Sequence, residues 1–246
     1  MARYFLEIAY EGANYSGWQI QPNAQTVQNT LDTALSALLS ESIRSVGCGR
    51  TDSGVHASQF FLHFDTLSAP PSELVYRLNK MLPNDISVFR LIPVADNAHA
   101  RYDATYRAYN YFIHFDKNPF LRYHSFFFPW TPLDMQSMQT ALEMLAHFND
   151  FKAFEKKNDA KTSLCNIFKT ALIYDEIQGR MQIHIAANRF LRGMVRRIVG
   201  TLLWVGKGKI SLLEFENALA KGKSFKITIT APPQALSLCE VRYSYI

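Results

Sequence analysis

Residues 47–58 (GCGRTDSGVHAS) bring three reactive side chains, Arg50, Asp52 and His56, together within seven residues and between glycines. Glycine and serine are typical of loops, so none of these side chains is expected to belong to a hydrophobic core. A carboxylate beside a guanidinium and an imidazole can act as a nucleophile or a general base. A single aspartate in a loop is more often a turn residue. The stretch therefore indicates a binding or catalytic site whose chemistry the rest of the sequence must supply.

A second candidate is a stretch of the chain that carries only positive charge. No acidic residue lies between Glu176 and Glu214, but seven basic residues do: Arg180, Arg189, Arg192, Arg196, Arg197, Lys207 and Lys209. The formal net charge of the whole chain is +5, so this stretch exceeds the entire surplus. A solvated helix face usually mixes both signs. Charge of one sign favours a polyanion, such as the phosphates of a nucleic acid.

Helical spacing predicts that some of these arginines share one face. At about 100° per residue, a helix over residues 189–206 places Arg189, Arg192 and Arg196 within roughly 60°, while Arg197 points elsewhere. One interpretation is that one arginine borders the core and the others are solvated. The other is that the helix lies under a cleft and offers a guanidinium to a carboxylate or phosphate.

Two tyrosines, Tyr109 and Tyr111, fall on one face of a predicted strand, residues 108–115 (AYNYFIHF). Such pairs usually pack in a core or at a sheet edge. Arg101 and the basic and aromatic residues around it, 101–111 (RYDATYRAYNY), add donors and rings that a base-reading surface would use.

Composition and spacing exclude several classes of protein. With 48% hydrophobic and 19% charged residues, the chain is globular and not disordered. Its three cysteines and seven histidines lack the spacing of a disulfide framework or a metal site, and residues 200–208 (GTLLWVGKG) depart from a phosphate-binding loop. We therefore predict no metal or cofactor. The first residues lack the apolar run of a signal peptide and no stretch reaches membrane-spanning length, so we expect a cytoplasmic protein that contacts no membrane.

The pattern of elements predicts an α+β fold with two related halves, residues 1–103 and 104–246. The first half has strands at 3–10, 42–49, 58–66 and 85–94 and helices at 26–40 and 72–82, with Thr26 as an N-cap. This β-α-β-β-α-β order is typical of a ferredoxin-like unit. We expect antiparallel sheets that merge into one extended sheet around a central cleft.

The second half repeats this pattern in outline. Its predicted strands are 108–115, 165–176, 180–188 and 238–246. Its predicted helices are 131–148, with Pro132 in the first turn, 189–206, and a shorter one opened by a capping box from Ser211 to Glu214.

Read together, these stretches resemble the tRNA pseudouridine synthase A family. Residues 49–57 (GRTDSGVHA) are similar to the active-site motif of the family, and residues 10–28 (YEGANYSGWQIQPNAQTVQ) to its N-terminal signature. Three more segments match in the same order: 78–86 (LNKMLPNDI), 99–113 (HARYDATYRAYNYFI) and 188–209 (NRFLRGMVRRIVGTLLWVGKGK). The resemblance is collinear over almost the whole chain.

The resemblance implies a pseudouridine synthase fold and isomerisation of uridine to pseudouridine in tRNA, at about positions 38 to 40 of the anticodon stem-loop, without a cofactor. It implies that Asp52 is the nucleophile, that Tyr109 stacks on the target base, and that Arg196 pairs with Asp52. Arg50 would help to extrude the nucleotide. The other substrate-binding candidates are His56, Arg101, Tyr111, Arg189, Arg192, Lys207 and Lys209. A homodimer in which one tRNA contacts both subunits is also implied.

Chemistry explains why the family would need this motif. The carboxylate of Asp52 must stay ionised to attack C1′ of the ribose or C6 of the base, or to remove the 2′ hydrogen. In a water-poor pocket a lone carboxylate tends to protonate, and a paired guanidinium prevents this. The glycines allow the backbone to approach a flipped nucleotide closely.

One segment departs from the family pattern. Glu155 follows Phe154 where relatives commonly carry an arginine, and residues 161–167 (KTSLCNI) lack the usual arginine before Ile167. Substrate range depends on this segment if it contacts tRNA.

Two other classes of function stay open. A non-catalytic RNA-binding or tRNA chaperone protein would use the same basic cleft and tolerate the loss of Asp52. An enzyme acting on small molecules would turn over without RNA.

Overall fold

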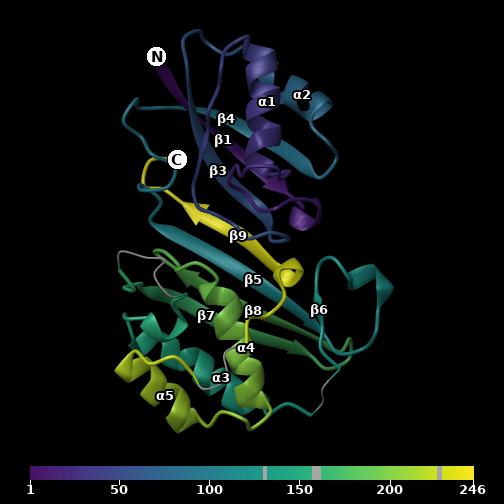
Figure 1. Ribbon diagram of the computed structural model, residues 1–246, viewed down its shortest axis with the longest axis vertical. Helices are drawn as coiled ribbons and strands as arrows, with labels where there is room; N and C mark the ends of the chain where they lie inside the picture. Colours follow the sequence, from purple (N-terminus) through teal and green to yellow (C-terminus); the bar gives the residue numbers. More distant parts are fainter. Residues whose placement is uncertain (130–131, 157–161, 226–228) are drawn as a thin grey trace. The chain divides into compact units, whose positions relative to one another are not determined.

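The computed structural model describes residues 1–129, 132–156, 162–225 and 229–246 (Figure 1). The chain forms two compact units. Unit 1 comprises Met1–Thr105 and Ser237–Ile246, and unit 2 comprises Tyr106–Leu236. The last ten residues, which the predicted division at residue 103 assigns to the second half, thus pack with the first.

Unit 1 contains the predicted β-α-β-β-α-β order followed by the last strand of the chain. Its elements are β1 (Ala2–Tyr10), α1 (Val27–Leu39), β2 (Val46–Gly47), β3 (His56–Thr66), α2 (Leu74–Met81), β4 (Ile86–Val94) and β9 (Leu236–Arg242). The strand order is β4-β1-β3, and both pairings are antiparallel. The short β2 pairs with β3 in the antiparallel sense, whereas β9 pairs with the first residues of β3 in the parallel sense.

Unit 2 contains β5 (Tyr106–His114), β6 (Phe126–Phe127), α3 (Met135–Met144), β7 (Ile167–Asp175), β8 (Arg180–Ala187), α4 (Met194–Gly206) and α5 (Leu212–Lys221). The strands β5, β8 and β7 form an antiparallel set in that order, and β6 pairs with β5 in the parallel sense. Short 3-10 helices occupy Gly12–Asn14, Pro119–Leu121, Leu145–His147, Lys152–Phe154 and Pro233–Ala235. The mixed α/β class is confirmed. The predicted antiparallel pairing holds for β1 with β3 and β4, for β2 with β3, and for β8 with β5 and β7, whereas β6 and β9 pair in the parallel sense.

The strand β1 is buried on both faces, because apolar residues occupy positions on each of them. Leu6 and Ile8 are fully buried on one face of the strand. The two helices of the unit, α1 and α2, lie beside each other (Figure 1). Phe5 points to the opposite face and packs edge-on against Tyr243 and Tyr245 of the C-terminal residues. The C-terminal residues therefore complete the core of unit 1.

Helix boundaries follow local capping. Thr26 accepts a hydrogen bond from the Asn29 N–H, as predicted, and Ser211 accepts one from the Glu214 N–H. The third helix begins later than predicted. Asp134 is its N-cap, and the Asp134 carboxylate accepts a hydrogen bond from the Ser137 N–H. Residue 131, where that helix was expected to start, lies outside the described residues.

The predicted helix over residues 189–206 is wrong in its first turn. Gly193 has φ 66°, a left-handed conformation that cannot continue an α-helix, and α4 begins only after it. Arg189 and Arg192 therefore precede the helix, and they do not share a helical face with Arg196.

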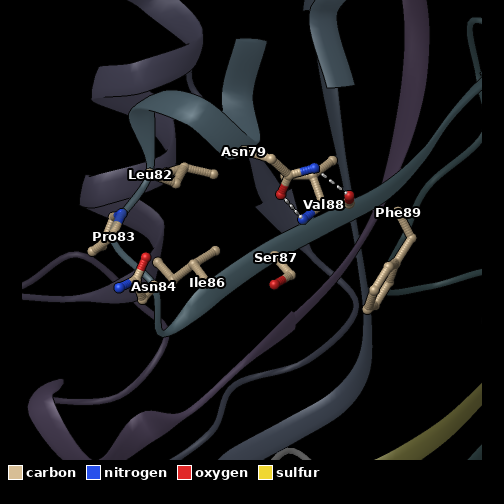
Figure 2. A pocket seen from close by; sticks show the side chains of 8 residues that line it. All are labelled: Asn79, Leu82, Pro83, Asn84, Ile86, Ser87, Val88 and Phe89. Carbon is tan, nitrogen blue, oxygen red and sulfur yellow. Dashed lines mark hydrogen bonds between the residues drawn. The ribbon is translucent and has the colours of Figure 1, made fainter. Parts of the chain in front are cut away.

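The segment 78–86 joins α2 to the edge strand β4. The side-chain amide of Asn79 accepts a hydrogen bond from the Val88 N–H at 2.8 Å and donates one to the Val88 carbonyl at 2.7 Å (Figure 2). The amide thus pairs with backbone groups that an edge strand otherwise leaves open. A surface pocket of about 420 Å³ lies beside it, and none of the predicted site residues lines this pocket.

Unit 1 buries a titratable histidine, His63, whose Nδ1 accepts a hydrogen bond from the Ala100 N–H at 3.1 Å. Burial, together with the charges of Arg3 and His99, lowers its pKa to about 4, although Asp65 and Asp103 act in the opposite direction. The unfolded chain therefore binds more protons than the folded protein between about pH 6.5 and 4. Stability is expected to fall as the pH falls through this window.

We predict that His63→Asn, which keeps an acceptor for Ala100 but does not titrate, reduces this loss by about 2 to 3 kcal/mol. Urea unfolding at several pH values between 7 and 4 measures it. The same change at the exposed His147 is the matched control and should leave the pH dependence close to that of the wild type. Identical pH dependence in the wild type and His63→Asn would contradict the prediction.

Candidate active site

The loop that carries Asp52 connects β2 to β3 in unit 1. The Val55 N–H donates to the Asp52 carbonyl at 3.1 Å and closes a tight turn that begins at the aspartate. Arg50 is exposed and Asp52 is half-buried, so both side chains remain at the surface of the unit. The hydrogen-bonded turn therefore holds the backbone of Asp52 in place, while the side chain stays partly accessible to solvent.

The N-terminal signature holds this loop in place. The Trp18 N–H donates to the Thr51 carbonyl at 3.2 Å, and the Tyr10 hydroxyl lies 2.9 Å from the Thr51 hydroxyl. The Tyr15 carbonyl accepts hydrogen bonds from the Gly54 N–H at 3.3 Å and from the Ser53 hydroxyl at 3.2 Å. These contacts fix the residues on both sides of Asp52.

Glycine is required where the signature approaches the loop. Gly17 has φ 89°, and a Cβ there would lie 2.5 Å from the Thr51 carbonyl oxygen. A larger residue would strain its own backbone and push the loop away. Sequence reasoning matched residues 10–28 to the family but missed this scaffold role. The spacing of Gly17 and Trp18 ahead of the motif is the only signal of it, and that spacing has no meaning without the fold.

His56 serves the same scaffold. It begins β3, is buried, and its Nδ1 accepts a hydrogen bond from the Gly12 N–H at 3.0 Å. This contact joins the end of the Asp52 loop to the start of the signature. The structure therefore gives the Nδ1 atom of His56 a positioning role, whereas the sequence predicts substrate contact for this residue.

Arg196 and Tyr109, the other two predicted catalytic residues, lie in unit 2. Arg196 is in the first turn of α4, where its Nε donates to the Ala231 carbonyl at 2.7 Å and its own carbonyl accepts the Ala231 N–H at 3.0 Å. Tyr109 is half-buried on β5, and its ring packs edge-on against Phe190 at 5.3 Å. Both side chains are thus oriented by neighbours within their own unit.

Tyr111 is a correction to the predicted substrate contacts. It is fully buried, and its hydroxyl donates to the Pro232 carbonyl at 2.9 Å. Burial raises the pKa of this hydroxyl above its ordinary range. Tyr111 is therefore a core residue that holds the segment next to Ala231, and it offers no surface to a substrate.

The basic candidates separate into two groups. Arg189 donates to the carbonyls of Thr162 and Leu164, each at 3.3 Å, and Arg192 is exposed. Lys207 and Lys209 follow the other end of α4, whose 13 residues span about 20 Å. These four candidates thus lie beyond the two ends of α4 and not along one of its faces.

Lys207 has an aromatic environment. Its ammonium lies 4.3 Å from the Trp204 ring and 4.9 Å from the Phe128 ring. Desolvation, followed by the charge of Lys209, lowers its pKa. Such cation–π contacts fix the lysine and make it part of the packing around the end of α4.

Arg197 and Phe154 anchor the segment that departs from the family. Arg197 donates to the Phe154 carbonyl at 3.1 Å, which confirms that Arg197 points away from Arg196. Phe154 is fully buried, whereas Glu155 is half-buried. Residues 157–161 of the departing segment lie outside the described residues.

The structure thus places Asp52 in unit 1 and both Tyr109 and Arg196 in unit 2. The pairing of Asp52 with Arg196 stays a prediction. Arg101 is exposed in unit 1, with its guanidinium 5.7 Å from the Tyr102 ring. Among the described residues, no group of three or more histidine, cysteine, aspartate or glutamate side chains could hold a metal ion. Within the same residues no helix has the length and apolarity needed to cross a membrane.

Comparisons with known proteins match most of the chain. The profile of a family described as tRNA pseudouridine synthase matches residues 7–103 and 142–244. The tRNA pseudouridine synthase A of Azobacteroides pseudotrichonymphae genomovar. CFP2 is 42% identical over 247 residues, covering 99% of this chain and 97% of that protein. The proteins of the same name from Bacteroides fragilis and Thermoanaerobacter sp. (strain X514) are 42% and 39% identical, covering 98% and 99% of this chain and 96% and 100% of their own lengths.

The two ring nitrogens of His56 give a test of its role. Asparagine places an acceptor near the Nδ1 position, whereas glutamine places one near Nε2. If His56 acts through the Gly12 N–H, His56→Asn should keep most of the turnover with tRNA, and His56→Gln should lose about tenfold or more, because an unsatisfied buried N–H costs about 1 to 3 kcal/mol.

Thermal unfolding should show the same ranking as the turnover of the two variants. Rescue by glutamine and not by asparagine would show that His56 acts through Nε2, which would support the substrate contact that the sequence alone predicts for this residue.

Proposed function

The chain belongs to the tRNA pseudouridine synthase family, and we propose that it isomerises uridine to pseudouridine at about positions 38 to 40, in the anticodon stem-loop of tRNA. As a member of this family the chain is an isomerase that acts on tRNA. The observation that carries the proposal is the turn that presents Asp52, held on both sides by the N-terminal signature.

The reaction needs no added atoms or electrons. The bond between N1 of uracil and C1′ breaks, the base turns, a bond forms between C5 and C1′, and the proton lost from C5 is balanced by one gained at N1. We propose that Asp52 is the nucleophile or base that starts this exchange, by attack on C1′ or C6 or by removal of the 2′ hydrogen. The rigid turn suits this role because a group held in place loses little entropy on reaching the transition state.

Arg196 is proposed to keep Asp52 ionised. Because its Nε is bound to Ala231, the orientation of the planar guanidinium is fixed before any carboxylate approaches. Tyr109, oriented by Phe190, is proposed to stack on the target base and to take part in proton transfer. This arrangement requires units 1 and 2 to form a cleft between them, and we propose that they are ferredoxin-like-derived halves whose sheets join into one.

The remaining contacts to tRNA are proposed for basic groups that are exposed or half-buried. Arg50 would occupy the space left by the flipped nucleotide, since flipping costs a few kcal/mol. Arg101, Arg189, Arg192, Lys207 and Lys209 would contact phosphates and make binding dependent on salt. We also propose a homodimer that works in the cytoplasm, with one tRNA in contact with both subunits.

The alternative of a non-catalytic RNA-binding or chaperone protein predicts binding without a product. Mapping of pseudouridine in tRNA after incubation with the pure protein decides between the two. Pseudouridine at about positions 38 to 40 supports the proposal, and tRNA that is bound but unchanged refutes it.

We predict that Asp52→Asn lowers the single-turnover rate to below about a thousandth of the wild-type rate, because loss of a nucleophile costs several factors of ten. The fold and the Kd for tRNA should be nearly unchanged, since the side chains have almost the same volume. Asp96→Asn, at an exposed aspartate of the same unit, is the control and should stay active. A rate above that limit would remove Asp52 from the role of nucleophile.

We further predict that Arg196→Lys is nearly as inactive as Arg196→Ala, with a loss of about a hundredfold or more. An ammonium cannot bind the Ala231 carbonyl and a carboxylate through one planar group. Arg197→Lys on the same helix is the matched control and should lose less than about threefold, because its described contact with Phe154 needs only one donor. Equal losses in the two lysine variants, measured by kcat/KM, would contradict the pairing of Arg196 with Asp52.

A further inference from the structure

We propose that Tyr102, with Arg101 beside it, is a stacking platform for a base of the bound tRNA, at a distance from the reacting uridine. This inference rests on the proposed function, because it names a second contact of the same substrate. Its observations are the exposure of one aromatic ring, the rings packed beneath it, and the backbone that fixes it.

Tyr102 is 75% exposed, yet its ring is held in place. It packs on the His99 ring at 4.2 Å with an interplanar angle of 35°, and His99 packs edge-on against the buried His63 at 4.7 Å. The guanidinium of Arg101 lies 5.7 Å from the Tyr102 ring. The arrangement is a column of rings with its base in the core and its last ring in solvent.

The backbone that carries this column is tied down from several elements. The Ala100 N–H donates to His63 of β3, and the Ala100 carbonyl accepts the Tyr243 hydroxyl at 2.6 Å. Arg3 of β1 donates to the Ala98 carbonyl at 2.8 Å. Two strands and the C-terminal residues thus hold a segment of which the two tip side chains, Arg101 and Tyr102, remain exposed.

The tip of the segment is closed by hydrogen bonds to His99 and Asp103. The Nδ1 of His99 accepts the N–H groups of Arg101 at 3.1 Å and Tyr102 at 3.2 Å. The Asp103 carboxylate accepts the His99 N–H at 2.7 Å and the Tyr245 hydroxyl at 2.8 Å. His99 and Asp103 therefore both stabilise the turn. Because the turn is fixed, Tyr102 has little conformational entropy to lose when a ligand binds.

A fixed, exposed ring beside a guanidinium matches the chemistry of a nucleotide. An aromatic face stacks on a base for about 1 to 3 kcal/mol, and an arginine adds contact with phosphate or with the base plane. Tyrosine and arginine are also among the side chains enriched at the hot spots of protein interfaces.

The position within unit 1 separates this platform from the chemical step. The segment that carries the column is bound through the Ala98 carbonyl to Arg3, which pairs with Asp65 and Val94 at one end of the sheet. Tyr10 pairs with Ala57, next to the Asp52 loop, at the other end. The seven residue-to-residue steps of β1 from Arg3 to Tyr10 correspond to roughly 20 Å. The base that stacks on Tyr102 is therefore not the one that is isomerised, and the platform should affect affinity rather than the rate of the chemical step.

The experiment compares Tyr102→Phe, Tyr102→Leu and Tyr102→Ala for the Kd of tRNA and for the single-turnover rate at saturating protein. The phenylalanine variant should bind within about twofold of the wild type, and the leucine and alanine variants should raise the Kd by about five- to a hundredfold. The saturated rate should stay within about twofold in all three. Tyr76→Ala is the matched control, because Tyr76 is also exposed and carries Lys80 at 5.6 Å from its ring, and its Kd should not change.

Three results would overturn the platform: an unchanged Kd in Tyr102→Ala, a leucine variant as tight as the wild type, or an equal loss in Tyr76→Ala. A thermal unfolding midpoint within about 2 °C of the wild type is required of each variant, and the 75% exposure of Tyr102 makes this the expected result. If the wild type forms no pseudouridine, the proposed function fails, while the Kd series still decides on the platform.

Discussion

The hydrogen bonds between the N-terminal signature and the Asp52 loop are the constraint on which the rest of the candidate site depends. A carboxylate is useful in a reaction only when its position is fixed, yet the glycine and serine content of the loop favours many conformations. Thr51 resolves this conflict, because its carbonyl and hydroxyl contact Trp18 and Tyr10 on a strand and turn that fold around the core. The close approach at Gly17 then leaves the loop no room to move toward the signature.

Unit 2 also fixes the position of its proposed catalytic arginine, but on a helix rather than on a loop. Arg196 lies in the first turn of α4, and Ala231 fixes it through both a side-chain and a backbone hydrogen bond. Ala231 is in turn adjacent to Pro232, whose carbonyl is held by Tyr111. Tyr111 thus acts on the site from within the core, as a support for the segment that orients the arginine. In each unit, the residue that we propose to take part in the reaction is thus held by neighbours that are themselves fixed.

Much of this fold can be predicted from sequence, because periodicity reports burial. The strand of residues 3–10 and the helix capped by Thr26 follow from patterns within one element. The errors arise where the deciding contact is not local. A glycine inside an apolar helical pattern does not reveal that it is left-handed, as Gly193 is, and alternation on a strand does not reveal which face is covered, as at Tyr111. The role of His56 depends on Gly12, 44 residues away in sequence, so only the structure shows which ring nitrogen is occupied.

The contacts that hold the segment around Glu155 in place are separate from the side chain that departs from the family pattern. Phe154 packs with Phe215 and Phe225 and receives a hydrogen bond from Arg197, so the segment is anchored on the side where it enters the core. Glu155 follows this anchor, half-buried, with its N–H bound to the Lys152 carbonyl. A change of charge at position 155 therefore leaves the described anchor contacts in place. Because a glutamate repels phosphates where an arginine attracts them, we expect the departure to alter which tRNAs are accepted rather than the fold or the chemistry at Asp52.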